Sequence, residues 1–216
     1  MSLKEQLAAL KAKNAVSHPI ETVNIMLDCT KELGESGILD GVPKTGEKLK
    51  DFTLSNHLGQ EISLASLRKN GPVVVTFYRG GWCPYCNLEL HAYQQILPQI
   101  KAAGATLVAI SPELPDESLT TSQRHSLEFE VLTDTNVDYA RELGLVFTLS
   151  DKLRPIYESF GIRIEKHNGK GQFDLPLAAT FVVDVDGTIV CADVDADYTV
   201  RTEPSDVVKV LQSLRK

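Results

Sequence analysis

The sequence predicts an α/β protein whose mixed β-sheet is covered by helices on both faces. Two nearly all-apolar runs, residues 73–77 and 106–110, are typical of strands buried on both faces of a sheet. Helical patterns follow these runs, and a hairpin signal at Asp186-Gly187 precedes a closing helical pattern. Strands that alternate with helices and end in a hairpin and a helix indicate a layered sheet.

Residues 1–45 are predicted to be a helical extension that precedes the sheet. Apolar residues recur at helical spacing in residues 3–10 and again in residues 23–27. Asn14 and the Ser-His-Pro stretch at 17–19 are expected to separate the two helices. We interpret the extension as an amphipathic cap that packs on the core, with a dimerisation arm as the alternative.

Residues 46–216 are predicted to form the main domain. Its expected elements are a hairpin at 52–64, strands at 73–77, 106–110 and 131–132, helices at 87–103, 119–129, 137–143 and 153–159, a hairpin at 180–192 and a helix at 205–214. Glycines that follow the patterns at 87–103 and 137–143 are typical helix ends. Residues 145–178 carry the weakest pattern, a short helix and a loop rich in Gly and Lys.

The composition excludes several classes of function. The 22 basic and 29 acidic residues give a net charge of −7, whereas nucleic acids and anionic membranes attract basic surfaces. No apolar stretch reaches the roughly 18 residues of a membrane span, and the N-terminus lacks the apolar core of a signal peptide. We therefore expect a cytoplasmic protein. The four cysteines of such a protein are expected to be free or redox-active rather than structural.

The motif Cys83-Pro84-Tyr85-Cys86 carries the chemistry. It lies between a buried strand and a helical pattern, which is the layout of a thioredoxin-like redox site. A helix N-terminus lowers the pKa of a cysteine there, and proline fits the first turn because it has no N–H to leave unpaired. We expect a reversible Cys83–Cys86 disulfide. A zinc site is disfavoured because no second ligand pair is recognisable, and no cofactor is implied.

Of the two thiols, Cys83 is expected at the helix tip and more exposed, whereas Cys86 is expected to point inward one turn later.

Three neighbours of these cysteines are candidate supporting residues. Glu89 shares the face of Cys86 and is interpreted as a proton acceptor, or as a solvated helix glutamate. Arg79 is interpreted as a thiolate-stabilising cation, or as a surface arginine. Trp82 is expected to shield the disulfide and form a docking surface, or only to pack.

The remaining cysteines and an acidic run receive plainer interpretations. Cys29 and Cys191 are expected to be core thiols, with a resolving role as the alternative. Asp193, Asp195 and Asp197 alternate along the chain but lack a glycine-containing calcium loop. We therefore expect them to form an exposed acidic turn.

The order of the motifs resembles the peroxiredoxin superfamily, the group of alkyl hydroperoxide reductases and thiol-specific antioxidants. The resemblance runs from about residue 46 to residue 216. It rests on Asp51-Phe52-Thr53-Leu54, Phe77-Tyr78, Cys86 with Glu89, Ala109-Ile110-Ser111-Pro112, Leu132-Thr133-Asp134, and Thr180-Phe181-Val182-Val183-Asp184 with Gly187. It implies a thioredoxin-like fold, reduction of hydroperoxides, and electrons from thioredoxin or a similar dithiol.

The chain departs from the family pattern around the cysteines. In the family register, Cys86 falls on the peroxide-reactive cysteine, Cys83 replaces a threonine and Arg79 replaces a proline. The family's distant arginine is expected at Ala178, so the sequence predicts that this arginine is missing. Ala178 also stands where thioredoxins have a cis-proline, and Pro176 lies two residues earlier.

Three functions follow from these observations. The leading one is thiol-dependent reduction of hydroperoxides. The second is reduction of protein disulfides, because Cys-Pro-Tyr-Cys is also the glutaredoxin signature, and the third is a non-enzymatic redox sensor or binding module. Thioredoxin chemistry makes Cys83 the attacking thiolate, whereas the peroxiredoxin register makes Cys86 the oxidised group. Both routes end in the Cys83–Cys86 disulfide, and the attacking cysteine and a homodimeric state stay open.

Overall fold

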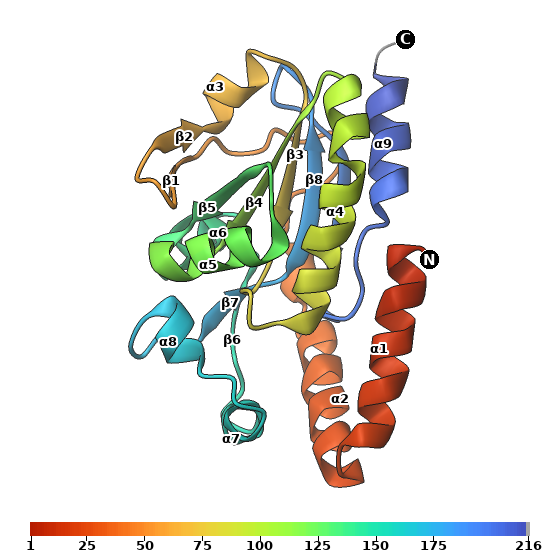
Figure 1. The fold of residues 1–216 in the computed structure, drawn as a ribbon, viewed down its shortest axis with the longest axis vertical. Coiled ribbons are helices and arrows are strands. Elements are labelled where there is room, and N and C mark those ends of the chain that lie inside the picture. The colour runs from red at the N-terminus through yellow and green to blue at the C-terminus, as the bar shows by residue number, and fades with distance from the viewer. Residues whose placement is uncertain (215–216) are drawn as a thin grey trace.

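A seven-stranded mixed sheet lies at the centre of the computed structural model, which describes residues 1–214 (Figure 1). The strand order is β2-β1-β5-β4-β3-β8-β9. Its strands are β1 (Thr53–Asn56), β2 (Glu61–Ser63), β3 (Val73–Phe77), β4 (Thr106–Ser111), β5 (Glu130–Thr133), β8 (Ala178–Val183) and β9 (Ile189–Asp195). Strands β3, β4 and β5 are parallel, whereas β1, β2, β8 and β9 are antiparallel to their neighbours. The predicted fold class is confirmed.

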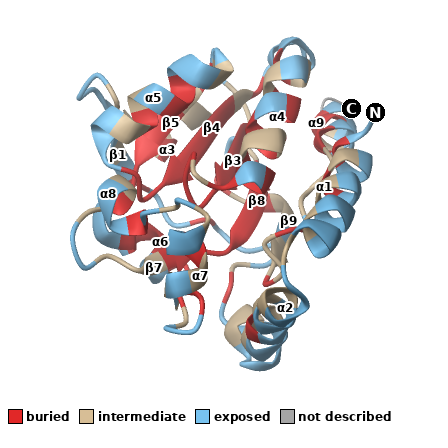
Figure 2. Cartoon of the chain, turned by 60° about the horizontal axis from the view of Figure 1, so that its bottom comes forward, coloured by how far each residue is buried: buried red, intermediate tan, exposed pale blue. Residues whose placement is uncertain are grey.

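Helices cover both faces of this sheet. The helices of the main domain are α3 (Leu64–Arg68), α4 (Pro84–Ala102), α5 (Pro115–His125), α6 (Asp138–Glu142), α7 (Arg154–Ser159), α8 (Ile164–Asn168) and α9 (Pro204–Ser213). Because side chains alternate along a strand, Val74 faces the apolar cluster with α4 and α9, and Val73 and Val75 face the cluster with α6. Figure 2 shows the central strands as the buried layer between the helices.

Two helices precede the sheet, α1 (Leu3–Ser17) and α2 (Ile20–Glu35), followed by a 3-10 turn at Ile38–Asp40. Helix α1 begins at a capping box of Ser2 and Glu5. It lies against α4 and buries Leu3 and Leu7 there. Within one chain the extension is therefore a cap on the core. A dimerisation role and the domain boundary at residue 45 stay predictions.

Several predicted bounds differ from the observed ones. Asn14 and Ser17 lie inside α1, so only His18 and Pro19 separate the two helices. Helix α4 begins at Pro84 rather than near residue 87, and α5 begins and ends four residues earlier than expected. Strands β6 (Val146–Thr148) and β7 (Asp174–Pro176) form a second, two-stranded sheet that the sequence did not predict. Three-residue strands are too short to show a period-two pattern.

The last two residues of the predicted domain, 215–216, lie outside the described residues. Within residues 1–214, every helix is too short or too polar to cross a membrane.

Candidate active site

The cysteine loop leaves the carboxyl end of β3 and enters α4 through two glycines. Gly80 has a φ of +147°, and a Cβ added there would collide with the indole of Trp82. A Cβ on Gly81 would collide with Thr121 of α5. The Gly81 N–H donates a hydrogen bond of 2.8 Å to the buried Glu113 carboxylate. The backbone therefore passes a site too narrow for a side chain, and a buried carboxylate fixes its path.

Both cysteines of the motif are fully buried, each with 0% relative exposure. Cys83 is the N-cap residue of α4 and Cys86 lies in the first turn. Both are free thiols. The prediction that Cys83 is the more exposed thiol is wrong, because elements far away in the sequence cover the helix tip. Asn14 of α1 donates a hydrogen bond of 3.2 Å to Tyr85 Oη, and the ring of Tyr198 packs edge-on against Tyr85.

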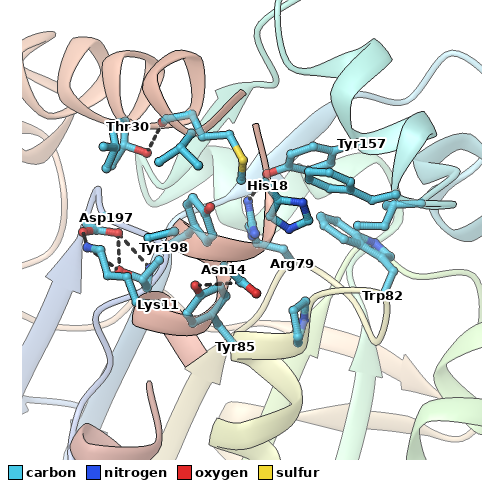
Figure 3. A pocket seen from close by; sticks show the side chains of 18 residues that line it. Lys11, Asn14, His18, Thr30, Arg79, Trp82, Tyr85, Tyr157, Asp197 and Tyr198 are labelled. Atoms are coloured by element: carbon cyan, nitrogen blue, oxygen red, sulfur yellow. Dashed lines mark hydrogen bonds and ion pairs between the residues drawn. The ribbon is translucent and has the colours of Figure 1, made fainter. Parts of the chain in front are cut away.

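Arg79 is buried beside Cys83. Its side chain is only 3% exposed, and its Nη2 donates to Cys83 Sγ at 3.2 Å. Nη1 donates to Tyr157 Oη at 3.1 Å, and the guanidinium lies 4.0 Å from the ring centre of Tyr198 and 5.1 Å from that of Trp82 (Figure 3). The surface-arginine interpretation is therefore wrong.

No carboxylate in residues 1–214 forms an ion pair with Arg79. A buried cation without a counter-charge is costly. Two groups that can become anions lie at hydrogen-bond distance, the Cys83 thiol and the Tyr157 hydroxyl, and a thiol is the stronger acid of the two. The geometry around Arg79 therefore favours a thiolate at Cys83.

Cys86 has its own cation, and the sequence did not reveal it. Arg201 lies between β9 and α9, where its Nη2 donates to Cys86 Sγ at 3.4 Å and its Nε donates to Glu89 Oε2 at 2.8 Å. Glu89 is 1% exposed, so the solvated-glutamate interpretation is wrong. The expected arginine position, Ala178, begins β8. The prediction that Cys86 lacks an arginine is corrected, because a different segment supplies one.

The segment that carries Arg201 is held by hydrogen bonds from both sides. Thr202 donates to Asp193 Oδ2 at 2.8 Å. Asp197 pairs with Lys11 of α1 at 2.9 Å and accepts from Thr199. The prediction of an exposed acidic turn is wrong, because Asp193 and Asp195 lie in β9, only Asp197 lies in the turn that follows, and only Asp193 is exposed. Within residues 1–214, no group of three or more His, Cys, Asp or Glu side chains is arranged to hold a metal ion.

The electrostatics of the two thiols differ. Burial alone raises the pKa of Cys83, but the hydrogen bond from Cys86 and the charges of Arg79 and Arg201 bring that pKa well below its usual value. Burial raises the pKa of Cys86, and the neighbouring Cys83 raises it further. Burial also raises the pKa of Glu89 to about 7, although Arg201 opposes this rise. The charges therefore balance in two pairs, Arg79 with the Cys83 thiolate and Arg201 with Glu89.

The other predicted residues lie as follows. Trp82 is partly buried beside Arg79, with its ring centre 5.9 Å from that of Tyr157. Cys29 of α2 is buried in an apolar cluster, as predicted. Cys191 of β9 is only partly buried.

Comparisons with known proteins show the family of the chain. The profile of the AhpC/TSA family matches residues 45–192, more than half of the chain. A putative peroxiredoxin of Mycobacterium tuberculosis is 29% identical over 154 residues, which cover 71% of this chain and 87% of that protein. The chloroplastic peroxiredoxin Q of Sedum lineare is 27% identical over 168 residues, covering 76% and 75% of the two chains.

Solved structures show the same fold. Peroxidoxin BcpB from M. tuberculosis superposes with a TM-score of 0.63 at 20% identity, covering 80% of this chain and 99% of that one. The Xanthomonas campestris bacterioferritin comigratory protein gives 0.59 at 18% identity, over 76% and 92% of the chains.

The match to the AhpC/TSA family and the fold identify a thiol peroxidase of the peroxiredoxin type. The chain belongs to the AhpC/TSA family. The resemblance inferred from the sequence is confirmed, and the disulfide-reductase and sensor alternatives are not favoured. Helices α1 and α2 precede the matched segment and Arg201 follows it.

Proposed function

We propose that the protein reduces hydroperoxides by cycling a Cys83–Cys86 disulfide, with electrons from thioredoxin or a similar dithiol. One observation carries this proposal. Two buried free thiols stand at the start of α4, and each is contacted by its own guanidinium group. Membership of the AhpC/TSA family supports a peroxide as the oxidant. A reducing compartment such as the cytoplasm would supply the donor, and we propose that setting.

The first step oxidises Cys83. Its thiolate attacks the terminal oxygen of R–O–OH, so an S–O bond forms as the O–O bond breaks. Sulfur loses two electrons and becomes a sulfenic acid, and the leaving alkoxide takes the proton of the Cys86 thiol to become an alcohol. The Arg79 guanidinium, 3.2 Å from Cys83 Sγ, is placed to stabilise charge that develops on the peroxide oxygens.

The second step forms the disulfide. Cys86, now a thiolate beside Arg201, attacks the sulfur of the Cys83 sulfenic acid. The S–S bond forms as the S–O bond breaks, and the departing hydroxide takes up a proton to become water. The dithiol donor then reduces the disulfide by thiol–disulfide exchange, which returns two electrons and two protons. The net reaction converts one hydroperoxide and one dithiol into an alcohol, water and a disulfide.

Stoichiometric oxidation of the reduced protein tests this function. Hydrogen peroxide or an alkyl hydroperoxide is added, and free thiols and the alcohol product are followed in time by mass spectrometry. We expect one hydroperoxide to consume the Cys83 and Cys86 thiols together and to leave one alcohol. The Cys29→Ser/Cys191→Ser double variant should behave in the same way. If peroxide leaves all four thiols unchanged, the proposed function is wrong.

A further inference from the structure

An open pocket of about 640 Å³ lies between the N-terminal helices and the cysteine loop (Figure 3). Helix α2 contributes Val23, Met26 and Leu27 to its wall, and the cysteine loop contributes Arg79 and Trp82. Its volume lies in the range of roughly 300–1,000 Å³ that is usual for small-molecule sites. Hydrogen peroxide, with two heavy atoms, would leave almost all of this volume empty.

The pocket is apolar, but two buried hydrogen-bond donors in its wall lack a partner. Its wall is mainly aliphatic and aromatic. The Nε of Arg79 and the Nε1 of Trp82 are buried and make no hydrogen bond within residues 1–214. A buried donor without an acceptor is costly, so such groups in a pocket indicate a ligand that brings an acceptor. Arg79 also contacts Cys83 Sγ, so the acceptor would lie beside the reactive sulfur.

We propose that this pocket binds the apolar body of a bulky organic hydroperoxide, with its –OOH group toward Arg79, the wall residue that contacts the buried Cys83. Helices α1 and α2 then make the enzyme selective for aryl-alkyl or long-chain hydroperoxides over hydrogen peroxide. The proposal rests on the proposed function, and the bound substrate reacts by the two steps described above to give the corresponding alcohol. These helices lie outside the segment matched by the family, so the selectivity belongs to this chain's own extension.

The first test uses the intrinsic fluorescence of the protein. Trp82 is the single tryptophan of the chain and lines the pocket, so its emission reports occupancy. The reduced protein is titrated with 2-phenyl-2-propanol, the unreactive alcohol that cumene hydroperoxide would yield. We expect a saturable change in emission. Val23→Phe fills part of the pocket and should weaken binding by about tenfold, a usual effect of a steric change in an apolar site.

A matched control separates filling the pocket from changing the helix. Ile25 lies on α2, two residues from Val23, but outside the pocket wall. Ile25→Phe adds a ring to the same helix and should keep the wild-type affinity. Leu27→Ala is a second variant that removes apolar wall instead of adding volume, at a half-exposed residue where folding tolerates the change. It should also weaken binding of the alcohol.

The second test is kinetic and distinguishes this inference from the proposed function. The kcat/KM for cumene hydroperoxide is divided by that for hydrogen peroxide. The ratio should fall by about tenfold in Val23→Phe and stay unchanged in Ile25→Phe. An unchanged ratio in Val23→Phe and Leu27→Ala, with no saturable fluorescence response, would overturn the pocket assignment while peroxidase activity persisted. Absence of reaction with either peroxide would refute the proposed function instead, and alcohol binding would still report on the pocket.

Discussion

Arg79→Gln should raise the pKa of Cys83 by about one to two units. The guanidinium donates a hydrogen bond of 3.2 Å to Cys83 Sγ, and no carboxylate within residues 1–214 forms an ion pair with its charge. A hydrogen bond to a charged group contributes roughly 1.5–3 kcal/mol, and 1.36 kcal/mol corresponds to one pKa unit. Loss of the cation destabilises the thiolate and not the thiol, so the pKa rises. Once the pKa exceeds the assay pH, the rate falls by about tenfold per unit.

Alkylation resolved by peptide is the appropriate assay, because it keeps both thiols in place. The reduced protein reacts with iodoacetamide over a range of pH, and the Cys83 and Cys86 modifications are quantified separately by mass spectrometry. Arg201→Gln is the matched control. It removes the cation that contacts Cys86 and Glu89, so it should change Cys86 more than Cys83. Arg79→Lys keeps the charge and should restore part of the Cys83 reactivity, which a merely structural arginine would not do.

One result would refute this reasoning. If Arg79→Gln folds, as judged by circular dichroism, yet leaves the titration of Cys83 unchanged, the thiolate is not the counter-ion of Arg79. If Arg201→Gln then raises a low pKa at Cys86 by the expected amount, Cys86 is the attacking thiolate. The peroxiredoxin register would hold, and the order of the two steps proposed above would be reversed.

Three further predictions follow from the same site. Glu89 has a pKa raised from 4.5 to about 7, so between these pH values it binds a proton more tightly in the folded than in the unfolded state. The free energy of unfolding should therefore fall, by about 3 kcal/mol, as pH rises from 4.5 to 7, where Glu89 ionises and pairs with Arg201. Glu89→Gln should remove this pH dependence of the free energy of unfolding, measured by urea unfolding at several pH values. An unchanged pH dependence would show that Glu89 does not cause it. Peptide mapping after peroxide treatment should find a Cys83–Cys86 disulfide, whereas a bond through Cys29 or Cys191 would contradict it. Cys86→Ser should accumulate a sulfenic acid at Cys83, detected with a sulfenic-acid probe, and Cys83→Ser should react slowly with peroxide. A sulfenic acid trapped at Cys86 in Cys83→Ser would show that Cys86 is oxidised first.

The regular part of the fold could be predicted because its elements are long enough to show a pattern. The nearly all-apolar run of β3 and the helical stripe of α4 each indicate burial without any knowledge of their neighbours. The cysteine motif lies between them, so its place at a helix start followed directly. Strands β6 and β7 have three residues each, and their pairing depends on tertiary contacts that no local pattern encodes.

The candidate site could be predicted only as far as its local segment. Arg79, Trp82 and Glu89 lie within a few residues of the cysteines, so the sequence placed them near the site but could not tell burial from exposure. The covering residues come from α1 and from the segment before α9, far away along the chain. Arg201 lies in an irregular segment without periodicity, so no signal in a single sequence joins it to Cys86.

The two substitutions around Cys83 are coupled by charge. In the register of the family, a cysteine takes the place of a threonine and Arg79 takes the place of a proline four residues earlier. A second thiol alone would be buried without a cation and would stay protonated and unreactive, because burial raises a thiol pKa. Arg79 alone would be a buried cation without an anion. Together they form a neutral pair at 3.2 Å, while Arg201 and Glu89 form a second neutral pair beside Cys86. Each thiol is thus contacted by its own guanidinium group.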